Sequence, residues 1–246
     1  KNALKPQFFM RKRTVEPCYD TKADWEIFSG LAKRMDLPEL VFETAEDLWN
    51  FQLEGTGVKI EDFDAKGMVS LADKPVYLDF DSYKFNTPSG KLEIISKKFE
   101  DSGIDSLKPY ESPEKPKKGD FRLTFGRCAL HTQGHTVNNP MLSDQMSENV
   151  LWINTGEAQK LGISDGEVVN VTQNDYTETI KAKVTDMIHP EAVFVIHGFG
   201  HRLEVESIAF GKGLADNKFM AGGMEIWDKA GGAIAYQEHF VTISKA

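Results

Sequence analysis

A proline-rich, charged segment divides the chain into two parts that carry different patterns. Three prolines alternate with charged residues between Pro109 and Gly119. Proline cannot continue a helix or a central strand, so this composition favours an extended, solvated linker. We therefore predict a first region at residues 1–108, a linker at 109–119 and a second domain at 120–246.

Helix signals dominate before the linker. Apolar residues recur at helical spacing between Trp25 and Met35, Thr21 and Asp24 resemble a capping box, and Pro38 ends the pattern. We expect the apolar and aromatic side chains of this helix to lie in a core, which is their most common place in a folded protein.

The rest of the first region predicts three further elements. A second helix is expected from Thr44, as its N-cap, to Gly55. The Thr-Pro-Ser-Gly sequence at 87–90 predicts a turn, and residues 92–94 predict a short strand after it. The first region is therefore expected to be small, mostly helical and of the α+β type.

Strand signals dominate after the linker. The Asn174-Asp175 pair predicts a turn between two strands, and a short helix is expected from Asn154 or Thr155 to Gly162. This many short strands with turn signals favours a closed β-barrel with small helices. The strands are predicted at residues 121–125, 151–153, 167–172, 179–185, 192–197 and 240–244.

The composition argues against several classes of protein. Lys and Arg total 29 against 38 Asp and Glu, which gives a net charge of −9. Binding to a nucleic-acid backbone rests on clustered cations, so we expect no nucleic acid as partner. No apolar run approaches the roughly 18 residues of a membrane span, so we expect no span in this chain. Cys18 and Cys128 are too few for a disulfide framework and lack the spacing of metal ligands.

Two stretches that follow predicted strands hold most of the unusual polar residues. They cover residues 126–140 and 197–202, and each contains a His-x-x-x-His pattern. Loops on a rigid scaffold concentrate binding residues, so we expect both stretches at the rim of the barrel. A glycine precedes each second histidine, and no metalloprotease glutamate accompanies the pattern. Three hypotheses stay open: histidines that hydrogen-bond a polar ligand, histidines that cap loop backbone, and a four-histidine metal site.

No self-sufficient catalytic centre is recognisable in the sequence. Ser89 does not lie in a Gly-x-Ser-x-Gly turn, and the glycines beside Lys212 lack the spacing of a phosphate loop. Cys128 could be a nucleophile with His131 nearby, although a small buried residue is the more common role of a lone cysteine. The glycine-rich loops instead offer backbone N–H groups and polar side chains such as Arg127 to an extended ligand with phosphates and purine-like edges.

Four segments of the chain, taken in order, resemble one known family. They are residues 11–28, residues 85–93, the loop that starts at Gly126 and residues 151–171. Together they are similar to the C-terminal part of the catalytic subunit of molybdopterin oxidoreductases, the dimethyl sulfoxide reductase superfamily. The resemblance covers essentially the whole chain.

This resemblance implies a fold and a set of cofactors. The last domain would be a double-psi β-barrel that binds the molybdopterin dinucleotide, and residues 1–108 would be the C-terminal remnant of the domain before it. The cofactor would be a bis(molybdopterin guanine dinucleotide) that holds molybdenum and is shared with other domains. The molybdenum ligand and the cysteines of a 4Fe-4S cluster would belong to an N-terminal part, so we expect no metal ligand among these residues.

The resemblance also assigns roles to residues of the two loops and of the later strands. Arg127 would meet a phosphate, and the side chains between His131 and His135 would lie on the pterin side. His197 and His201 would face the substrate funnel, with no catalytic residue in this chain. The full cofactor-binding set is Gly126, Arg127, Leu130, His131, Thr132, Gln133, His135, Asn217 and Gln237.

Within the superfamily, residues 131–140 and 197–201 look most like thiosulfate and polysulfide reductases. Arsenate and tetrathionate reductases are the alternatives, together with a self-contained, non-catalytic ligand-binding barrel. By family we expect a periplasmic enzyme of anaerobic respiration, with an iron–sulfur electron-transfer subunit and a membrane anchor as partners. The chain starts at Lys1 without a signal-peptide pattern, so we expect a piece of a larger or processed protein that is inactive in isolation.

Overall fold

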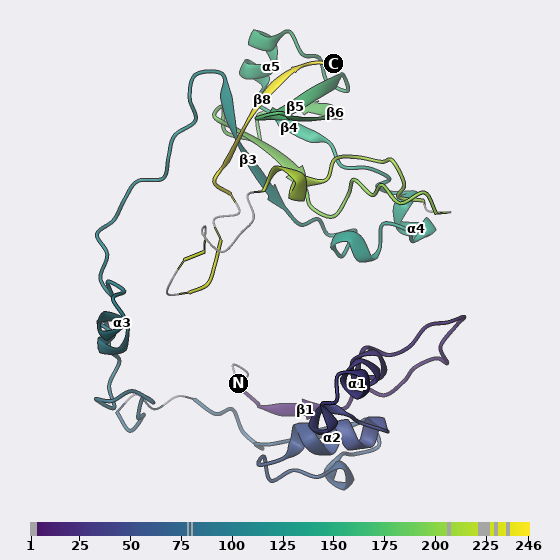
Figure 1. Cartoon of the computed structure of the whole chain (residues 1–246), viewed down its shortest axis with the longest axis vertical. Helices are drawn as coiled ribbons and strands as arrows, with labels where there is room; N and C mark the ends of the chain where they lie inside the picture. Colours follow the sequence, from purple (N-terminus) through teal and green to yellow (C-terminus); the bar gives the residue numbers. More distant parts are fainter. Residues whose placement is uncertain are drawn as a thin grey trace. The chain divides into compact units, whose positions relative to one another are not determined.

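The chain forms two compact units in a computed structural model. They are Lys1–Leu92 and Glu93–Ala246 (Figure 1). The structure describes residues 4–77, 79, 81–205, 208–220, 227–228, 231–234 and 237–246.

The first unit combines two helices with a two-stranded sheet. Helix α1 spans Asp24–Arg34 and helix α2 spans Ala45–Leu53. Strands β1 (Gln7–Phe9) and β2 (Met68–Ser70) pair antiparallel, and the sequence pattern did not predict them.

The two helix starts differ in how well they were predicted. Thr44 caps α2 as expected: its hydroxyl accepts the Asp47 N–H at 3.1 Å, and the Asp47 carboxylate accepts the Thr44 N–H at 2.9 Å. The predicted Thr21–Asp24 box of α1 is wrong. The N-cap is Ala23, whose N–H donates to the Glu26 carboxylate at 2.6 Å.

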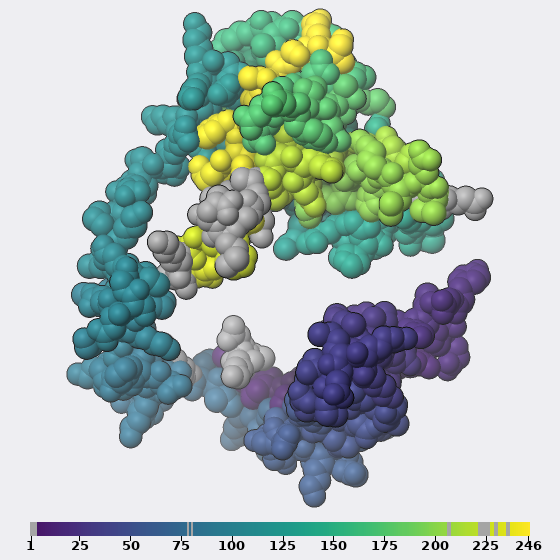
Figure 2. Space-filling model, in the orientation of Figure 1, coloured from purple at the N-terminus to yellow at the C-terminus, as the bar shows by residue number. Residues whose placement is uncertain are grey.

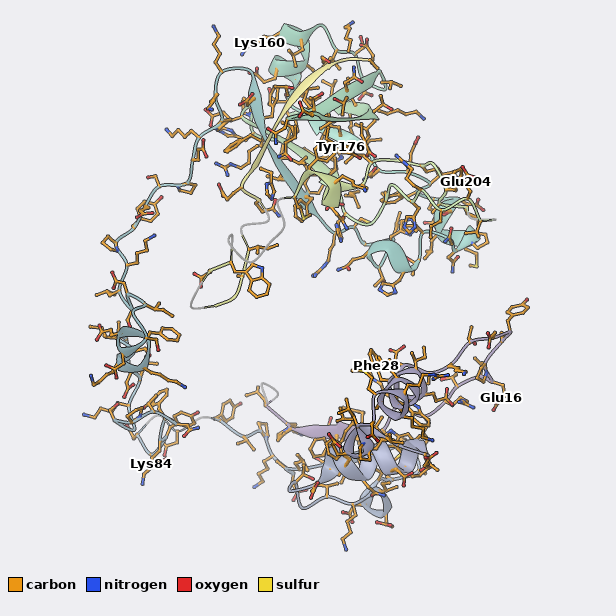
Figure 3. All side chains as sticks on the ribbon, in the orientation of Figure 1. Glu16, Phe28, Lys84, Lys160, Tyr176 and Glu204 are labelled. Atoms are coloured by element: carbon orange, nitrogen blue, oxygen red, sulfur yellow. The ribbon has the colours of Figure 1, made fainter. Side chains whose placement is uncertain are left out.

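The apolar face of α1 is largely exposed, which corrects the expectation that it lies in a core. Phe28 is 67% exposed and Met35 60%, and Phe28 points outward from the helix in Figure 3. Ser29 and Ala32 are the buried positions of α1. Helical spacing shows that one face is apolar, but it does not show that other elements of the same unit cover that face.

The residues that lead into the barrel contain one of the predicted turns and a short helix. The turn at 87–90 is confirmed, with the Gly90 N–H donating to the Thr87 carbonyl at 3.0 Å, but the strand predicted at 92–94 does not form. Helix α3 (Lys97–Asp101) follows instead, capped by Ser96. From Leu107 to Lys118 the residues are nearly all exposed, and Figure 2 shows this stretch as a single extended chain.

The second unit is built on a closed barrel whose strand order is β3-β7-β4-β6-β5-β8. Strands β3 and β7 pair parallel, as do β4 and β6, whereas the other four pairs are antiparallel. This mixed, closed arrangement of six strands is a double-psi β-barrel, as the sequence resemblance implies. The strands are β3 Asp120–Gly126, β4 Leu151–Ile153, β5 Val168–Gln173, β6 Tyr176–Val184, β7 Ala192–Ile196 and β8 His239–Lys245.

The barrel interior is filled by alternate residues of its strands. Leu123, Ile153, Val169, Val195 and Val241 are at most 1% exposed. Alternation puts every second side chain inside, so the six strands together enclose one dry core. Other fully or nearly buried members are Phe121, Leu151, Val171, Ile180, Ala182, Val193 and Ile243.

Local signals in the sequence predicted one helix and one turn beside the barrel, whereas the four-residue helix at 140–143 was not predicted. Helix α5 spans Thr155–Leu161, with the Asn154 side chain accepting the Gly156 N–H and Gly162 ending it at φ +67°. The β5–β6 turn contains Asn174 at φ +50°, a left-handed conformation that asparagine tolerates better than most residues. Helix α4 (Pro140–Ser143) lies in the segment between β3 and β4. No helix in the described ranges has the length and hydropathy of a membrane span.

Candidate functional site

The two histidine-containing stretches leave the barrel at the same end. They follow β3 and β7, which are parallel neighbours with Gly126 paired to Ile196. Parallel strands send their following loops to one edge, so this register places the loops side by side. Figure 1 shows the segment with α4 and the segment after β7 at this common end.

Glycines allow these loops to approach each other at backbone distance. Gly198 has φ +102°, and a Cβ there would overlap the backbone of Gln133. Gly200 has φ +80°, and a Cβ there would overlap the backbone of Ala215. The sequence feature behind the convergence is therefore the Gly-Phe-Gly triplet, because only glycine permits both the positive φ and the close contact.

Asn149 ties a third segment, residues 213–217, to the end of β7. Its side chain is 1% exposed and donates to the carbonyls of Ile196 (2.7 Å) and Leu214 (3.0 Å). The same amide accepts the Leu214 N–H at 2.8 Å. Three hydrogen bonds from one buried amide fix the start of the segment that carries Asp216 and Asn217.

A buried carboxylate contacts one of the predicted site histidines. The Oδ2 atom of Asp216 lies 2.6 Å from Nδ1 of His197, and Asp216 is 0% exposed. Its other oxygen, Oδ1, is buried without a hydrogen-bond partner among the residues that the structure describes. The histidine ring keeps 27% of its side-chain surface exposed, so the pair has one buried and one accessible end.

Glu178 of β6 holds the same segment from the barrel side. Its carboxylate accepts the Ala215 N–H at 3.3 Å and lies 3.5 Å from Nη2 of Arg202. Burial, followed by its hydrogen bond to Glu178, raises the pKa of Tyr176 to about 12. Tyr176, labelled in Figure 3, packs edge-on against Phe219 with ring centroids 5.2 Å apart.

Two adjoining clefts lie where these three segments meet, and both are lined by Gln133, His197 and Asn217. We call them together the rim cleft. One part, of about 680 Å³, also contains Phe125, Gly126, Arg127 and Met220. The other also contains Gly134, His135, residues 198–201 and Ala215.

The first unit contains a larger hollow of about 860 Å³, but its lining differs in kind. Trp25, Trp49 and Ile60 lie in it beside Arg11 and Glu46. Histidines, glycine-rich loops and close backbone approaches are found around the rim cleft instead, so the rim cleft is the candidate site.

The structure brings most of the predicted site residues to the rim cleft. Those that line it are Gly126, Arg127, Gln133, His135, His197, His201 and Asn217. Leu130, His131, Thr132 and Gln237 do not line either part of it. Of these last four, His131 and Gln237 have clear structural roles.

His131, predicted on the pterin side, turns into the loop interior. It is 5% exposed, with Nε2 at 2.8 Å from the Met146 carbonyl and Nδ1 at 3.3 Å from the Thr136 hydroxyl. The Thr132 N–H donates to the same hydroxyl at 2.9 Å. Both ring nitrogens are thus used to shape the loop that presents Gln133 and His135.

Gln237, predicted as a cofactor contact, instead extends the β3–β8 pairing. Its amide donates to the Phe125 carbonyl at 3.0 Å and accepts the Phe125 N–H at 3.1 Å. The backbone pairing of β3 with β8 ends at Leu123 and His239. The side chain therefore replaces a strand partner for a residue that lines the rim cleft.

The alternatives based on a nucleophile or a metal find little support in this geometry. The Cys128 sulfur accepts the backbone N–H of His131 at 3.3 Å, while the His131 ring bonds elsewhere. In the part of the chain that the structure describes, no three His, Cys, Asp or Glu side chains gather as metal ligands would. Three of the loop histidines are engaged in separate contacts: His131, His197 with Asp216, and His201 with the Gly198 carbonyl at 3.3 Å.

Two residues of the site had no signal in the sequence. Asp216 lies in a 3₁₀ turn, Asp216–Phe219, where neither helical nor strand periodicity applies. Asn149 precedes β4 and looks like an ordinary loop residue. Their partners are 19 and 65 positions away in the chain, so only the fold reveals them.

The comparisons with known proteins agree with this barrel. Residues 121–230 match the family model described as "Molydopterin dinucleotide binding domain". The thiosulfate reductase molybdopterin-containing subunit of Salmonella typhimurium is 25% identical over 87% of this chain and 31% of its own length. The arsenate respiratory reductase molybdopterin-containing subunit of Chrysiogenes arsenatis is 32% identical over 43% of this chain and 14% of its own length.

A solved structure supports the fold over nearly the whole chain. Acetylene hydratase from Pelobacter acetylenicus has a TM-score of 0.76, with 21% sequence identity, over 98% of this chain and 35% of its own. The chain thus spans about a third of the length of its most extensively matched relatives. Residues 121–230 thus match a molybdopterin dinucleotide-binding domain, and most of the chain is similar to part of the molybdopterin oxidoreductases.

Proposed function

We propose that the chain is the dinucleotide-holding C-terminal part of a molybdenum reductase that acts on thiosulfate or polysulfide. The observation that carries the proposal is the rim cleft, where Arg127, Gln133, His197 and Asn217 come together from three segments at one end of the barrel. We further propose that the dinucleotide is the guanine form, in a bis arrangement shared with other domains.

The residues of the rim cleft fit such a ligand chemically. Arg127 is exposed and offers a planar, permanently charged fork, which suits a diphosphate. Gln133 and Asn217 each offer a donor and an acceptor, which suits the edge of a pterin or guanine ring. The glycines at 198 and 200 bring the loops close enough to form one continuous surface.

Each group would do a simple task toward the bound ligand. Arg127 would hold the diphosphate, and Gln133, His135 and Asn217 would orient the ring systems. His201, which lines the other part of the cleft, would lie on the substrate side. His197, which the resemblance also places at the substrate funnel, lines both parts of the cleft and would contact the bound dinucleotide instead. The molybdenum, when bound through the pterin, would supply the redox chemistry, and the protein would supply orientation.

The choice of thiosulfate or polysulfide rests on the extent of the similarity to one relative. The thiosulfate reductase subunit aligns with 87% of the chain, whereas the arsenate reductase subunit aligns with 43% at higher identity. Arsenate and tetrathionate are the alternative substrates within the same superfamily. A self-contained, non-catalytic ligand-binding barrel is the alternative from another class.

The remaining parts of the proposal concern the whole enzyme. We propose a 4Fe-4S cluster in the N-terminal part of the protein, an iron–sulfur subunit and a membrane anchor as partners, and a periplasmic location. Relatives described as molybdopterin-containing subunits, such as that of the Salmonella thiosulfate reductase, support a multi-subunit enzyme.

The test is to purify the enzyme that contains this chain and to analyse its cofactor and its substrates. Acid treatment should release about two GMP per molybdenum, since a bis(guanine dinucleotide) carries two nucleotides. With a reduced viologen as donor, thiosulfate or polysulfide should be turned over faster than arsenate or tetrathionate. Faster turnover of arsenate would mean that arsenate is the substrate in place of thiosulfate or polysulfide. The absence of both molybdenum and GMP would favour the non-catalytic barrel.

A further inference from the structure

The contact between His197 and Asp216 determines which nitrogen of the histidine ring is available to a ligand. Asp216 is fully buried, and its Oδ2 lies 2.6 Å from Nδ1 of His197. A carboxylate accepts hydrogen bonds and does not donate them, so Nδ1 carries the proton. In the neutral ring the other nitrogen, Nε2, is then a hydrogen-bond acceptor.

The other histidines with ring contacts have the opposite arrangement. His131 directs Nε2 to the Met146 carbonyl, and His201 directs Nε2 to the Gly198 carbonyl. The Nδ1 atom of His189 accepts the Glu191 N–H at 3.1 Å, which leaves its proton on Nε2. Among these four contacted rings, His197 is the one whose Nε2 is left as an acceptor.

The position of His197 directs that acceptor toward a ligand. His197 lines both parts of the rim cleft, together with Gln133 and Asn217. The ring packs beside Phe125, with centroids 5.9 Å apart, which limits its rotation. The buried carboxylate below it, held by the segment that Asn149 and Glu178 fix, limits the rotation further.

The surroundings of Asp216 carry a cost in folding free energy that a purely structural residue would not need. The carboxylate has no solvent exposure, and its Oδ1 has no hydrogen-bond partner among the described residues. Buried charges that are incompletely paired lower stability, and an amide of the same shape would avoid that cost. A carboxylate that lowers stability yet orients a cleft residue is typical of a functional pair.

We propose that Asp216 is a positioning residue that keeps His197 in the Nδ1–H form, so that Nε2 accepts a hydrogen bond from an N–H group of a heteroaromatic ligand. The identity of that ligand, the pterin or the guanine of the dinucleotide, rests on the function proposed above. Arg127, by contrast, serves the phosphates. The two residues thus recognise different chemical groups in the same cleft.

The first test examines the ring itself and requires no cofactor. In the 15N-labelled full chain at pH 8, long-range 1H–15N spectra distinguish Nδ1–H from Nε2–H histidine rings. We expect His197 to be Nδ1–H in the wild type and to become a mixture of both forms in Asp216→Asn, because an amide can pair with either form. His189 is the internal control and should stay Nε2–H in both proteins.

The second test examines ligand recognition with three probes: neopterin, guanosine and inorganic pyrophosphate. Asp216→Asn should weaken neopterin or guanosine binding, depending on which ring lies at His197, by about five- to tenfold, the loss of roughly one hydrogen bond. Pyrophosphate, which has no N–H donor, should bind with unchanged affinity. Arg127→Ala should show the reverse pattern, with pyrophosphate affected and the ring probes spared.

Several results would overturn the inference. An unchanged His197 ring form in Asp216→Asn would show that the carboxylate does not set it. A large fall in the melting temperature of Asp216→Asn, with all probes weakened equally, would show a structural role. Binding of pyrophosphate without binding of neopterin or guanosine would mean that Nε2 of His197 accepts no hydrogen bond from a ring ligand. Failure of the proposed function would show separately, as an enzyme without molybdenum and GMP.

Discussion

At the scale of single residues, Arg127 is the side chain through which the rim cleft would hold a diphosphate. It follows β3 directly and is exposed in the cleft beside Gly126. A hydrogen bond to a charged group contributes about 1.5–3 kcal/mol, so Arg127→Ala should weaken GDP binding by roughly 10- to 100-fold. Arg127→Lys should recover part of this loss, since it keeps the charge but not the fork.

The measurement is calorimetric titration of the wild type and both variants with GDP. Lys183→Ala is the matched control, because Lys183 lies on β6 with its ammonium 5.6 Å from the Trp152 ring and does not line the rim cleft. If Arg127→Ala binds GDP as tightly as the wild type, Arg127 does not bind the diphosphate and is an ordinary surface arginine at the end of a strand.

Tyr176 provides a residue-scale prediction about alkaline pH. Burial and the Glu178 carboxylate raise its pKa to about 12, from the ordinary tyrosine value of 10.0. The folded state thus favours the protonated phenol, and this stabilisation is complete below pH 10 and is lost as pH rises from 10 through 12. Tyr176 should therefore ionise late, with a midpoint near pH 12.

The measurement is the tyrosinate absorbance of the folded chain as a function of pH. Tyr176→Phe should abolish the late component and should make the loss of stability between pH 10 and 12 shallower. The late component should persist in Tyr110→Phe, a control at an 84% exposed tyrosine in the linker. The absence of a late component from the wild-type curve would mean that the Tyr176–Glu178 contact does not hold in solution.

At the scale of elements, the convergence of the loops depends on Gly200. Alanine there would need φ +80° and would overlap the backbone of Ala215. We expect Gly200→Ala to lower the free energy of unfolding by about 3 kcal/mol, because it adds a steric clash to the strain of a left-handed residue. Gly211→Ala is the matched control: φ is +68°, but nothing lies within 4 Å of its Cβ position.

Urea denaturation compares the two variants. Gly211→Ala should lose only the backbone strain, about 1 kcal/mol, and should keep the rim cleft intact. Equal losses in both variants would show that the loop and the 213–217 segment do not lie in backbone contact.

The elements differ in how far the sequence predicted them, and the reason is the range of the interactions that form them. Helix α5 and the β5–β6 turn are set by signals inside the element, such as Asn154, Gly162 and Asn174, and they were found at their places. All six barrel strands were found for the same reason. The sequence did not predict that the apolar face of α1 is exposed, because exposure depends on whether other elements pack against that face.

The site was predicted less completely than the fold. That two loops meet at one rim followed from their places after strands, and seven of the eleven site residues line the rim cleft. The inward turn of His131 depends on a carbonyl 15 positions away, and the contact of Gln237 with Phe125 spans 112 positions. A local pattern contains no information about such contacts, and Asp216 was missed on the same ground.

At the scale of the whole molecule, the proposed function requires an acidic chain to bind an anionic ligand. Such binding depends on the side chains that lie close to the ligand. The chain has a net charge of −9, which opposes any polyanion at long range. Among the described residues, those that line the rim cleft nevertheless include Arg127 and no Asp or Glu. At physiological salt, charges more than about 8 Å apart are largely screened, so the nearby groups decide the binding of a small anion.

The division of the chain gives the last prediction, which concerns the border of the barrel domain. The segment from Leu107 to Lys118 is nearly all exposed and has no helix or strand, so a protease can bind its backbone. Trypsin should cut after Lys117 and Lys118, whereas Lys108 and Lys115 precede prolines and should resist. The expected product begins at residue 118 or 119 and keeps all six barrel strands.

Mass spectrometry over time gives the order of the cuts, and Lys117→Gln with Lys118→Gln should remove this product. If instead a fragment beginning after Lys91 accumulates and stays intact, the barrel requires residues 92–118, and the domain border lies at the division between the two compact units.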